Sequence, residues 1–159
     1  MDRLTAIMVR ASFVWLLIGV IVGGLMLSDR LLPGEWRLWA SPTHAHMLFV
    51  GWFLQFALGI AFWLLPRRRG PRQPLGYSEG RAFTAVGLLN LGLALRVVAE
   101  PAERAGFIAP WTERLLLGSS LLQVAAVAIF VTMLWPRAAA RRRPSAGDGA
   151  ATGAGTRDG

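Results

Sequence analysis

Two histidines separated by a single residue are the side chains of this sequence best suited to bind a metal. His44 and His46 stand in the segment SPTHAHMLFVGW, at the head of a long apolar run, and they are the only histidines in the chain. Residues two apart on a helix point to opposite sides of its axis, so one ion cannot be held by both rings unless the helix is frayed. Each histidine must therefore be judged alone.

A single imidazole that projects from a membrane helix is sufficient to hold haem, because the porphyrin already supplies four nitrogens. His46 lies deeper in the apolar run and is the candidate axial ligand, while His44 is a candidate second ligand. The sequence lacks cysteine and hence any CxxCH motif, which excludes covalent c-type attachment. Haem b is the form expected, and the sequence itself does not distinguish it from another non-covalent haem. The plainer alternative for either ring is an interfacial position, bonded to a backbone carbonyl or to water.

Copper or zinc handling is a further interpretation of the same two histidines. It would use His44 and His46 together, with Met47 as an adjacent soft donor, and it requires the first turn of the helix to be frayed.

A charged pair in the third apolar run, FTAVGLLNLGLALRVVAEP, is the next candidate for function. Arginine inside a membrane span is costly and by default marks a functional site. Arg96 and Glu100 are four residues apart, hence on one face of a helix and able to pair. Arg96 should lie near the level of His46, where it could meet the propionates of a haem. The alternative is a plain ion pair that reaches the membrane interface.

Small and polar residues in the other runs have simpler explanations. Ser119, Ser120 and Gln123 are expected to form hydrogen bonds between helices. Gln55 is similar, and Gly51 and Gly59 would let either another helix or a flat macrocycle approach closely. The sequence does not decide between those two.

Four apolar runs, each long enough to cross a bilayer as a helix, must position these residues. They cover residues 4–27, 42–65, 82–99 and 111–135 of a chain that is 54% hydrophobic. The expected fold is an all-α polytopic membrane four-helix bundle over residues 1–137. The first run is too long for a signal peptide and is expected to be retained. Ser41 and Pro42 resemble an N-cap and first helical residue, which predicts that the second helix begins at Pro42.

The charge pattern predicts the orientation of these spans. All 17 basic residues are arginine, and they concentrate after the second run and in the tail, so that the net charge of +8 falls on one side of the membrane. The positive-inside rule then predicts an inner-membrane protein with both termini cytoplasmic, and it makes nucleic-acid binding an unneeded explanation. Trp63 and Trp135 should mark the inner interface. The tail, residues 138–159, is expected to be disordered.

The run HMLFVGWFLQFALGIAFWLLPR, residues 46–67, resembles the second transmembrane helix of subunit I of the haem-copper oxidases, most closely the nitric oxide reductase and cbb3-type branch. The resemblance implies that His46 ligates a low-spin haem, and it gives His44 no counterpart. The family has many more spans and further histidines on several helices. This chain lacks the ligands of the copper centre, so terminal oxidase or nitric oxide reductase activity is not expected of it.

A haem held by His46 would need a further donor or an open position. A homodimer could supply His46 twice to one haem, Met26 or His44 could serve, or a gas could bind. The expected roles are electron transfer, gas sensing or support of a haem enzyme, with a respiratory-chain or haem-enzyme partner. The alternative from another class is a cofactor-free membrane scaffold or accessory subunit.

Overall fold

A computed structural model describes residues 1–28, 34–66, 75–107 and 109–139, which form helices only. The helices are α1 (Arg3–Met26), α2 (Trp36–His46), η1 (Met47–Leu54), α3 (Gln55–Leu64), α4 (Glu79–Arg104) and α5 (Pro110–Ala138). Because α2, η1 and α3 follow one another without a break, they form one long helix, which we call the second helix. The described residues thus contain four helices long and apolar enough to span a membrane, and the predicted all-α fold is confirmed.

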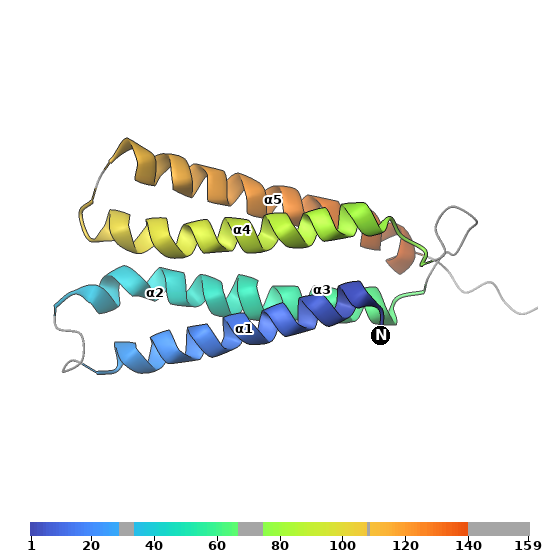
Figure 1. Ribbon diagram of the computed structural model, residues 1–159, viewed down its shortest axis with the longest axis horizontal. Coiled ribbons are helices and arrows are strands. Elements are labelled where there is room, and N and C mark those ends of the chain that lie inside the picture. Colours follow the sequence, from blue (N-terminus) through green and yellow to red (C-terminus); the bar gives the residue numbers. More distant parts are fainter. Residues whose placement is uncertain (29–33, 67–74, 108, 140–159) are drawn as a thin grey trace, which may run out of the picture.

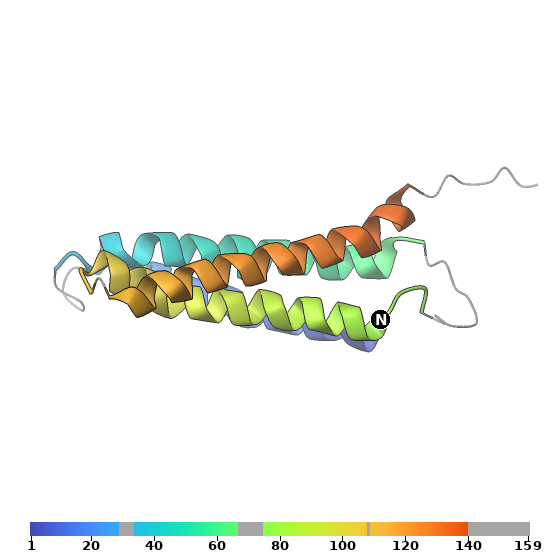
Figure 2. The ribbon, with the colours of Figure 1, turned by 90° about the horizontal axis from the view of Figure 1, so that it is seen from above.

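The four helices form two hairpins that lie side by side (Figures 1 and 2). The first pairs α1 with the second helix, and the other pairs α4 with α5. The N-terminus, the end of α3, the start of α4 and the end of α5 lie together at what we call the terminal end. His44 and His46 lie toward the opposite end, called the histidine end. Among the described elements, α5 packs along α4 and approaches the second helix only at α3.

The second helix begins six residues earlier than the sequence predicted. It starts at Trp36, so Pro42 is inside it and Ser41 is not its N-cap. A proline costs a membrane helix one backbone hydrogen bond, which its neighbours can compensate. Ala40 and Thr43 are buried on either side of the proline, and this packing favours a continuous helix.

A stretch of π-helix follows directly after His46. Residues Met47–Leu54 have this wider backbone, which is rare and is found preferentially at functional sites. Gly51 lies within it, and a methyl group there would come within 2.6 Å of Trp15 on α1 and 2.7 Å of Leu93 on α4. The missing side chain therefore lets three helices approach one another. Gly59 packs against Met8 of α1 in the same way.

Polar side chains join the helices in the middle of the bundle. Trp15 donates its indole N–H to Oδ1 of Asn90 at 2.8 Å, which links α1 to α4. Gln55 donates to the carbonyl oxygen of Met8 at 3.3 Å, as expected of a bond between helices.

The terminal end holds the aromatic part of the core. The ring of Phe62 lies 5.3 Å from that of Tyr77 and 5.8 Å from that of Phe130. Arg137 is 3% exposed and donates to the carbonyl oxygens of Phe62 at 2.9 Å and of Leu65 at 2.6 Å. These carbonyls end a helix and have no partner within it, so Arg137 caps α3 from α5.

Five of the seven tryptophans lie toward the ends of the bundle. Trp63 and Trp135 belong to the last turns of α3 and α5 at the terminal end, and both are largely exposed. Trp36, Trp39 and Trp111 belong to the histidine end. Of the predicted disordered tail, only Ala138 and Ala139 are among the described residues, and the arginine-rich segment 67–74 lies outside them as well.

Candidate functional site

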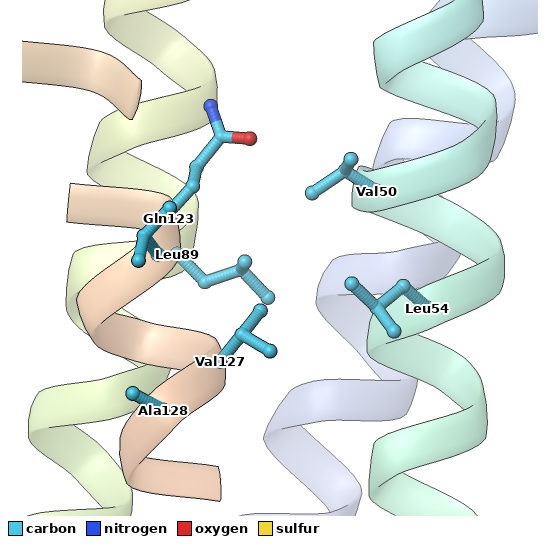
Figure 3. A pocket seen from close by; sticks show the side chains of 7 residues that line it. Val50, Leu54, Leu89, Gln123, Val127 and Ala128 are labelled. Atoms are coloured by element: carbon cyan, nitrogen blue, oxygen red, sulfur yellow. The ribbon is translucent and has the colours of Figure 1, made fainter. Parts of the chain in front are cut away.

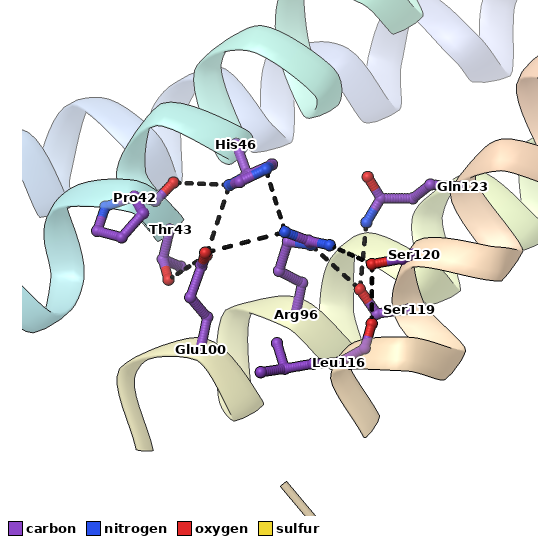
Figure 4. Close-up of polar contacts among 9 residues, drawn as sticks. All are labelled: Pro42, Thr43, His46, Arg96, Glu100, Leu116, Ser119, Ser120 and Gln123. Atoms are coloured by element: carbon purple, nitrogen blue, oxygen red, sulfur yellow. Dashed lines mark hydrogen bonds and ion pairs between the residues drawn. The ribbon is translucent and has the colours of Figure 1, made fainter. Parts of the chain in front are cut away.

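A cluster of seven polar residues joins the second helix, α4 and α5 at the histidine end (Figure 4). We call it the polar cluster, and its members are Thr43, His46, Arg96, Glu100, Ser119, Ser120 and Gln123. They come from α2, α4 and α5. The expected shared level of His46 and Arg96 is confirmed, because the two side chains are in contact.

The hydrogen bonds of His46 fix its tautomer. Its Nδ1 lies 2.8 Å from the carbonyl oxygen of Pro42 and 3.4 Å from Oε2 of Glu100. Both are acceptors, so Nδ1 carries the proton. Its Nε2 lies 3.2 Å from Nη1 of Arg96, which can only donate, so Nε2 offers a lone pair. This arrangement is characteristic of metal-binding histidines, in which a carbonyl or carboxylate holds the nitrogen that does not face the metal.

Arg96 is the centre of the cluster. Its Nε donates to Oγ of Ser119 at 3.2 Å and its Nη2 donates to Oγ of Ser120 at 2.6 Å. Its side chain is 17% exposed, so the charge is held largely inside the bundle. Arg96 therefore connects the two hairpins, since it reaches α5 with one side of its guanidinium and the second helix with the other.

Glu100 balances the charge of Arg96. Its Oε1 lies 3.8 Å from Nη1 of Arg96, which confirms the predicted pair, and its Oε2 accepts a hydrogen bond from Thr43 at 3.1 Å. The carboxylate thus touches both the histidine and the arginine. It keeps the imidazole proton on Nδ1 and leaves Nε2 to accept from Arg96 of α4.

His44 lies on the other side of the helix, as the two-residue spacing predicted. Its Nδ1 is 2.9 Å from the carbonyl oxygen of Gly19 on α1. Gly23 leaves room for the ring, since a methyl group there would come within 2.7 Å of its Cε1. This is the plain interfacial interpretation of His44, a ring bonded to a backbone carbonyl.

The joint copper or zinc site loses its structural basis. The helix is intact through both histidines, which face different helices, and Met47 is buried next to Gly19 of α1. Among the described residues, no group of three or more histidine, cysteine, aspartate or glutamate side chains could hold a metal ion. Haem differs in this respect because it needs only one or two protein ligands.

An apolar cleft begins where the polar cluster ends (Figure 3). It has a volume of about 390 Å³ and lies between Val50 and Leu54 of the second helix on one side and α5 on the other. The α5 side consists of Gln123, Val124, Val127 and Ala128, and Leu89 of α4 lines the cleft between them. Val124 is 67% exposed, so the cleft reaches the outer surface of the bundle.

Gln123 connects the cleft to the polar cluster. It lines the cleft, and its amide nitrogen lies 3.4 Å from Oγ of Ser119, which in turn accepts from Arg96. The arrangement could therefore receive a ligand that is apolar over most of its length and carries an acidic group at one end. A cleft of this volume lies within the range of about 300–1,000 Å³ usual for small-molecule sites.

Sequence reasoning found His46, Arg96, Glu100 and the polar residues of α5, but it missed the cleft. Val50 and Leu54 follow His46 at intervals of four residues, and Val124, Val127 and Ala128 follow Gln123 on α5. In a membrane protein such apolar spacing is indistinguishable from a lipid-facing surface. Thr43 was also missed, because its bond to Glu100 depends on how α2 and α4 pack.

Comparisons with protein-family models, with curated proteins and with solved structures found no match to this chain. The likeness of residues 46–67 to subunit I of the haem-copper oxidases therefore stays a hypothesis drawn from the residues themselves.

Proposed function

We propose that the chain is a membrane protein that binds haem b, with Nε2 of His46 as the axial ligand and the cleft between the second helix and α5 as the seat of the macrocycle. The observation that carries the proposal is the state of His46. Its Nδ1 proton is held by Pro42 and Glu100, and its Nε2 lone pair faces Nη1 of Arg96 at 3.2 Å, where the second helix meets α4. When bound, haem would supply reversible one-electron chemistry or an affinity for diatomic gases.

The residues beside His46 suit the rest of such a ligand. The cleft offers aliphatic walls for the porphyrin and an opening at Val124 through which part of a large ring can extend toward lipid. Arg96 lies next to the ligating nitrogen and has three donor nitrogens, which suit a propionate carboxylate. Because Nη1 of Arg96 lies 3.2 Å from Nε2, ligation would require the guanidinium to move aside, toward the edge of the macrocycle that carries the propionates.

One chain supplies a single histidine to this site, since His44 is engaged with α1. We therefore propose that a second copy provides the other axial ligand, or that the position stays open for a gas. A homodimer around a shared haem would suit electron transfer, with a respiratory-chain or haem-enzyme partner, whereas an open position would suit gas sensing. A monomeric particle that holds one six-coordinate haem would refute the shared arrangement.

We propose an inner-membrane location with both termini in the cytoplasm. The arginine-rich segment 67–74 and the tail both follow helices that end at the terminal end, and the N-terminus lies there too. The positive-inside rule places this end on the cytoplasmic side, and the polar cluster then lies near the periplasmic side.

An absorption spectrum of the full chain, purified in mild detergent after expression with added haem, tests the proposal. We expect a Soret band and, after reduction with dithionite, a sharp α-band. The bands should be lost in His46→Ala and retained in His44→Ala, which removes a ring of the same kind from the opposite side of the helix. A colourless wild-type protein, or equal loss in the two variants, would refute the assignment.

A second pair of variants tests the cleft. Ala128→Phe places a ring inside it, while Ala125→Phe adds the same ring to an exposed position on α5 that does not line it. We expect haem content to fall only in Ala128→Phe, with the helical circular dichroism of both variants unchanged.

A cofactor-free scaffold is the second candidate function, and one observation favours it. The described members of the polar cluster already satisfy one another, so the cluster can join the hairpins without any ligand. A scaffold predicts a colourless protein in which His46→Ala lowers stability and changes no spectrum.

A further inference from the structure

The outward face of α1 carries an arginine inside the membrane span. Arg10 is exposed and lies seven residues after the start of the helix, whereas the other exposed charges of the described helices lie within four residues of a helix end. Met8 and Ser12, two residues away on either side, are fully buried. Two residues correspond to about 200° of helical rotation, so Arg10 points away from the bundle. It has no hydrogen-bond or ion-pair partner among the residues that the structure describes.

The depth of Arg10 follows from the packing of α1 on the second helix. Gly59 lies against Met8 and Val9, since a methyl group at residue 59 would come within 3.2 Å of Met8. Trp63 is exposed one turn closer to the terminal end, and exposed tryptophans mark the level of the lipid headgroups. At about 1.5 Å per residue, Arg10 therefore begins about 9 Å inside that level. A charge at this depth is costly unless it is paired.

Arg10 belongs to a regular stripe of exposed residues along α1. Their spacing alternates between four and three residues, and we call them the α1 seam: Arg3, Ile7, Arg10, Val14, Leu17 and Ile21. This spacing is the one by which a long helix packs along a second helix. Arg3 begins the seam in the first turn of α1, so Arg10 is the one charge of the seam that lies beyond the first turn.

Two simpler occupants suit the seam less well. Copies of the chain with the same orientation in one membrane would pair their α1 helices in parallel, which would bring the two Arg10 side chains together. Like charges repel strongly where little water screens them. Lipid phosphates meet Arg3 directly, but they lie about one heptad away from the level of Arg10. By leaning toward the headgroups, Arg10 lowers its cost without gaining a fixed partner.

We propose that the α1 seam is the docking surface for a transmembrane helix of another protein, and that this helix carries an aspartate or glutamate at the depth of Arg10. A carboxylate is the complementary group, because it can accept two parallel hydrogen bonds from a guanidinium. Pairing would lower the cost of both charges at once. The proposal is independent of haem binding, since the seam shares no residue with the polar cluster or its cleft.

Resonance energy transfer in phosphatidylcholine vesicles tests the surface with a synthetic probe. The probe is a leucine–alanine helix of about 20 residues with one glutamate about 9 Å inside one end, where it carries the acceptor dye. The full chain carries the donor on its N-terminal amine, which is its only amine because the sequence has no lysine. We expect the glutamate probe to bind at least about tenfold more tightly than the same helix with glutamine, the effect of a charge-assisted hydrogen bond.

Three variants assign the preference to Arg10. Arg10→Leu should abolish it with the helical circular dichroism unchanged, because the side chain faces away from the bundle. Arg10→Glu should reverse it, so that a probe with arginine binds better than the glutamate probe. Arg3→Leu is the matched control, since Arg3 is exposed on the same seam one heptad nearer the terminal end. It should keep the preference within about twofold, because charges at the interface are screened.

Other results would overturn the proposal. Equal binding of the glutamate and glutamine probes, or a preference that persists in Arg10→Leu, would show that the seam does not select a carboxylate. If equimolar phosphatidylglycerol in the vesicles abolishes the preference of the wild type, Arg10 takes a lipid phosphate. Energy transfer between two labelled copies of the chain that falls in Arg10→Leu would show that a second copy covers the seam.

Discussion

Arg96→Met should be the most destabilising single change in the polar cluster. The substitution keeps the unbranched apolar stem and removes the guanidinium, which donates to Ser119 and Ser120, contacts His46 and pairs with Glu100. Hydrogen bonds between membrane helices contribute about 0.6 kcal/mol each on average, with a maximum near 1.7. Removing one partner of a buried ion pair costs about 3–5 kcal/mol when the other charge is left fully buried.

The structure lowers the expected cost of removing one partner of this ion pair. Glu100 is 12% exposed and keeps its contacts with Thr43 and His46, so its unpaired charge is only partly uncompensated. We therefore expect Arg96→Met to lower the free energy of unfolding by about 3–4 kcal/mol in total, most of it from the stranded carboxylate. Glu100→Gln alone should cost about 1 kcal/mol, because the amide oxygen can still accept from Thr43.

The double-mutant cycle of these two changes separates the pair from the rest. Reversible unfolding is followed by tryptophan fluorescence as sodium dodecyl sulfate is added to the protein in mild detergent. The double variant should be more stable than the sum of the single effects predicts, with a coupling of about 1–2 kcal/mol. Arg104→Met removes the same charge from an exposed position on α4 and should have little effect. Additivity within about 0.5 kcal/mol would refute the view that Glu100 and Arg96 depend on each other.

Three further changes test the packing of the bundle by the same unfolding measurement. Gly51→Ala should lower the free energy of unfolding by about 1–3 kcal/mol, because its methyl group would clash with Trp15. The control is Gly24→Ala, whose methyl group would meet nothing within 4 Å and which should be neutral or stabilising. The reverse order of the two effects would contradict the close approach of the helices. Asn90→Leu should cost about 0.6–1.7 kcal/mol and shift the fluorescence of the indole that it now binds. Arg137→Lys should destabilise the terminal end almost as much as Arg137→Gln, because a point charge cannot cap three carbonyls at once; full rescue by lysine would show that charge alone matters there.

The sequence predicted the helices well because each apolar run has about the length that a helix needs to cross the hydrocarbon core of a bilayer. It also predicted which sides His44 and His46 face, since helical geometry alone decides that. It placed the start of the second helix wrongly, because the pairing of Ser41 with Pro42 has the form of a helix start while tertiary packing around Ala40 and Thr43 decides otherwise. At such positions tertiary packing, and not the local sequence, determines where the helix begins.

The parts of the site that escaped prediction depend on the distance between helices. Thr43 meets Glu100, and Trp15 meets Asn90, across neighbouring helices, and the glycine at residue 51 lets α1 and α4 come close to the second helix. The π-helical stretch after His46 has no sequence signature that would distinguish it from an ordinary α-helix. The cleft lies where two apolar helix surfaces do not touch each other. Lipid-facing positions need the same apolar residues, so the sequence pattern does not distinguish a cleft from a lipid-facing surface.

The cleft has a consequence for how any ligand in it must be bound. The hairpins are joined by Arg96 and His46 at the histidine end, by Trp15 and Asn90 in the middle and by Arg137 at the terminal end. Apart from Gln123, the side chains that line the cleft are all aliphatic. In water such a gap would tend to close, because burying apolar surface is favourable. Within a bilayer that force is missing, since acyl chains are as apolar as the walls and can fill the space equally well.

A haem or any other largely apolar ligand therefore competes with lipid on nearly equal terms along the aliphatic walls. The surplus in binding free energy must come from polar groups that lipid tails lack. These are Gln123 at the wall of the cleft and, beyond it in the polar cluster, the lone pair of His46 and the guanidinium of Arg96. In a water-soluble pocket, burying the apolar macrocycle would itself contribute to the affinity. Here the loss on His46→Ala should be large even though the cleft is unchanged, because only polar contacts such as those of Arg96 would then distinguish the ligand from the membrane around it.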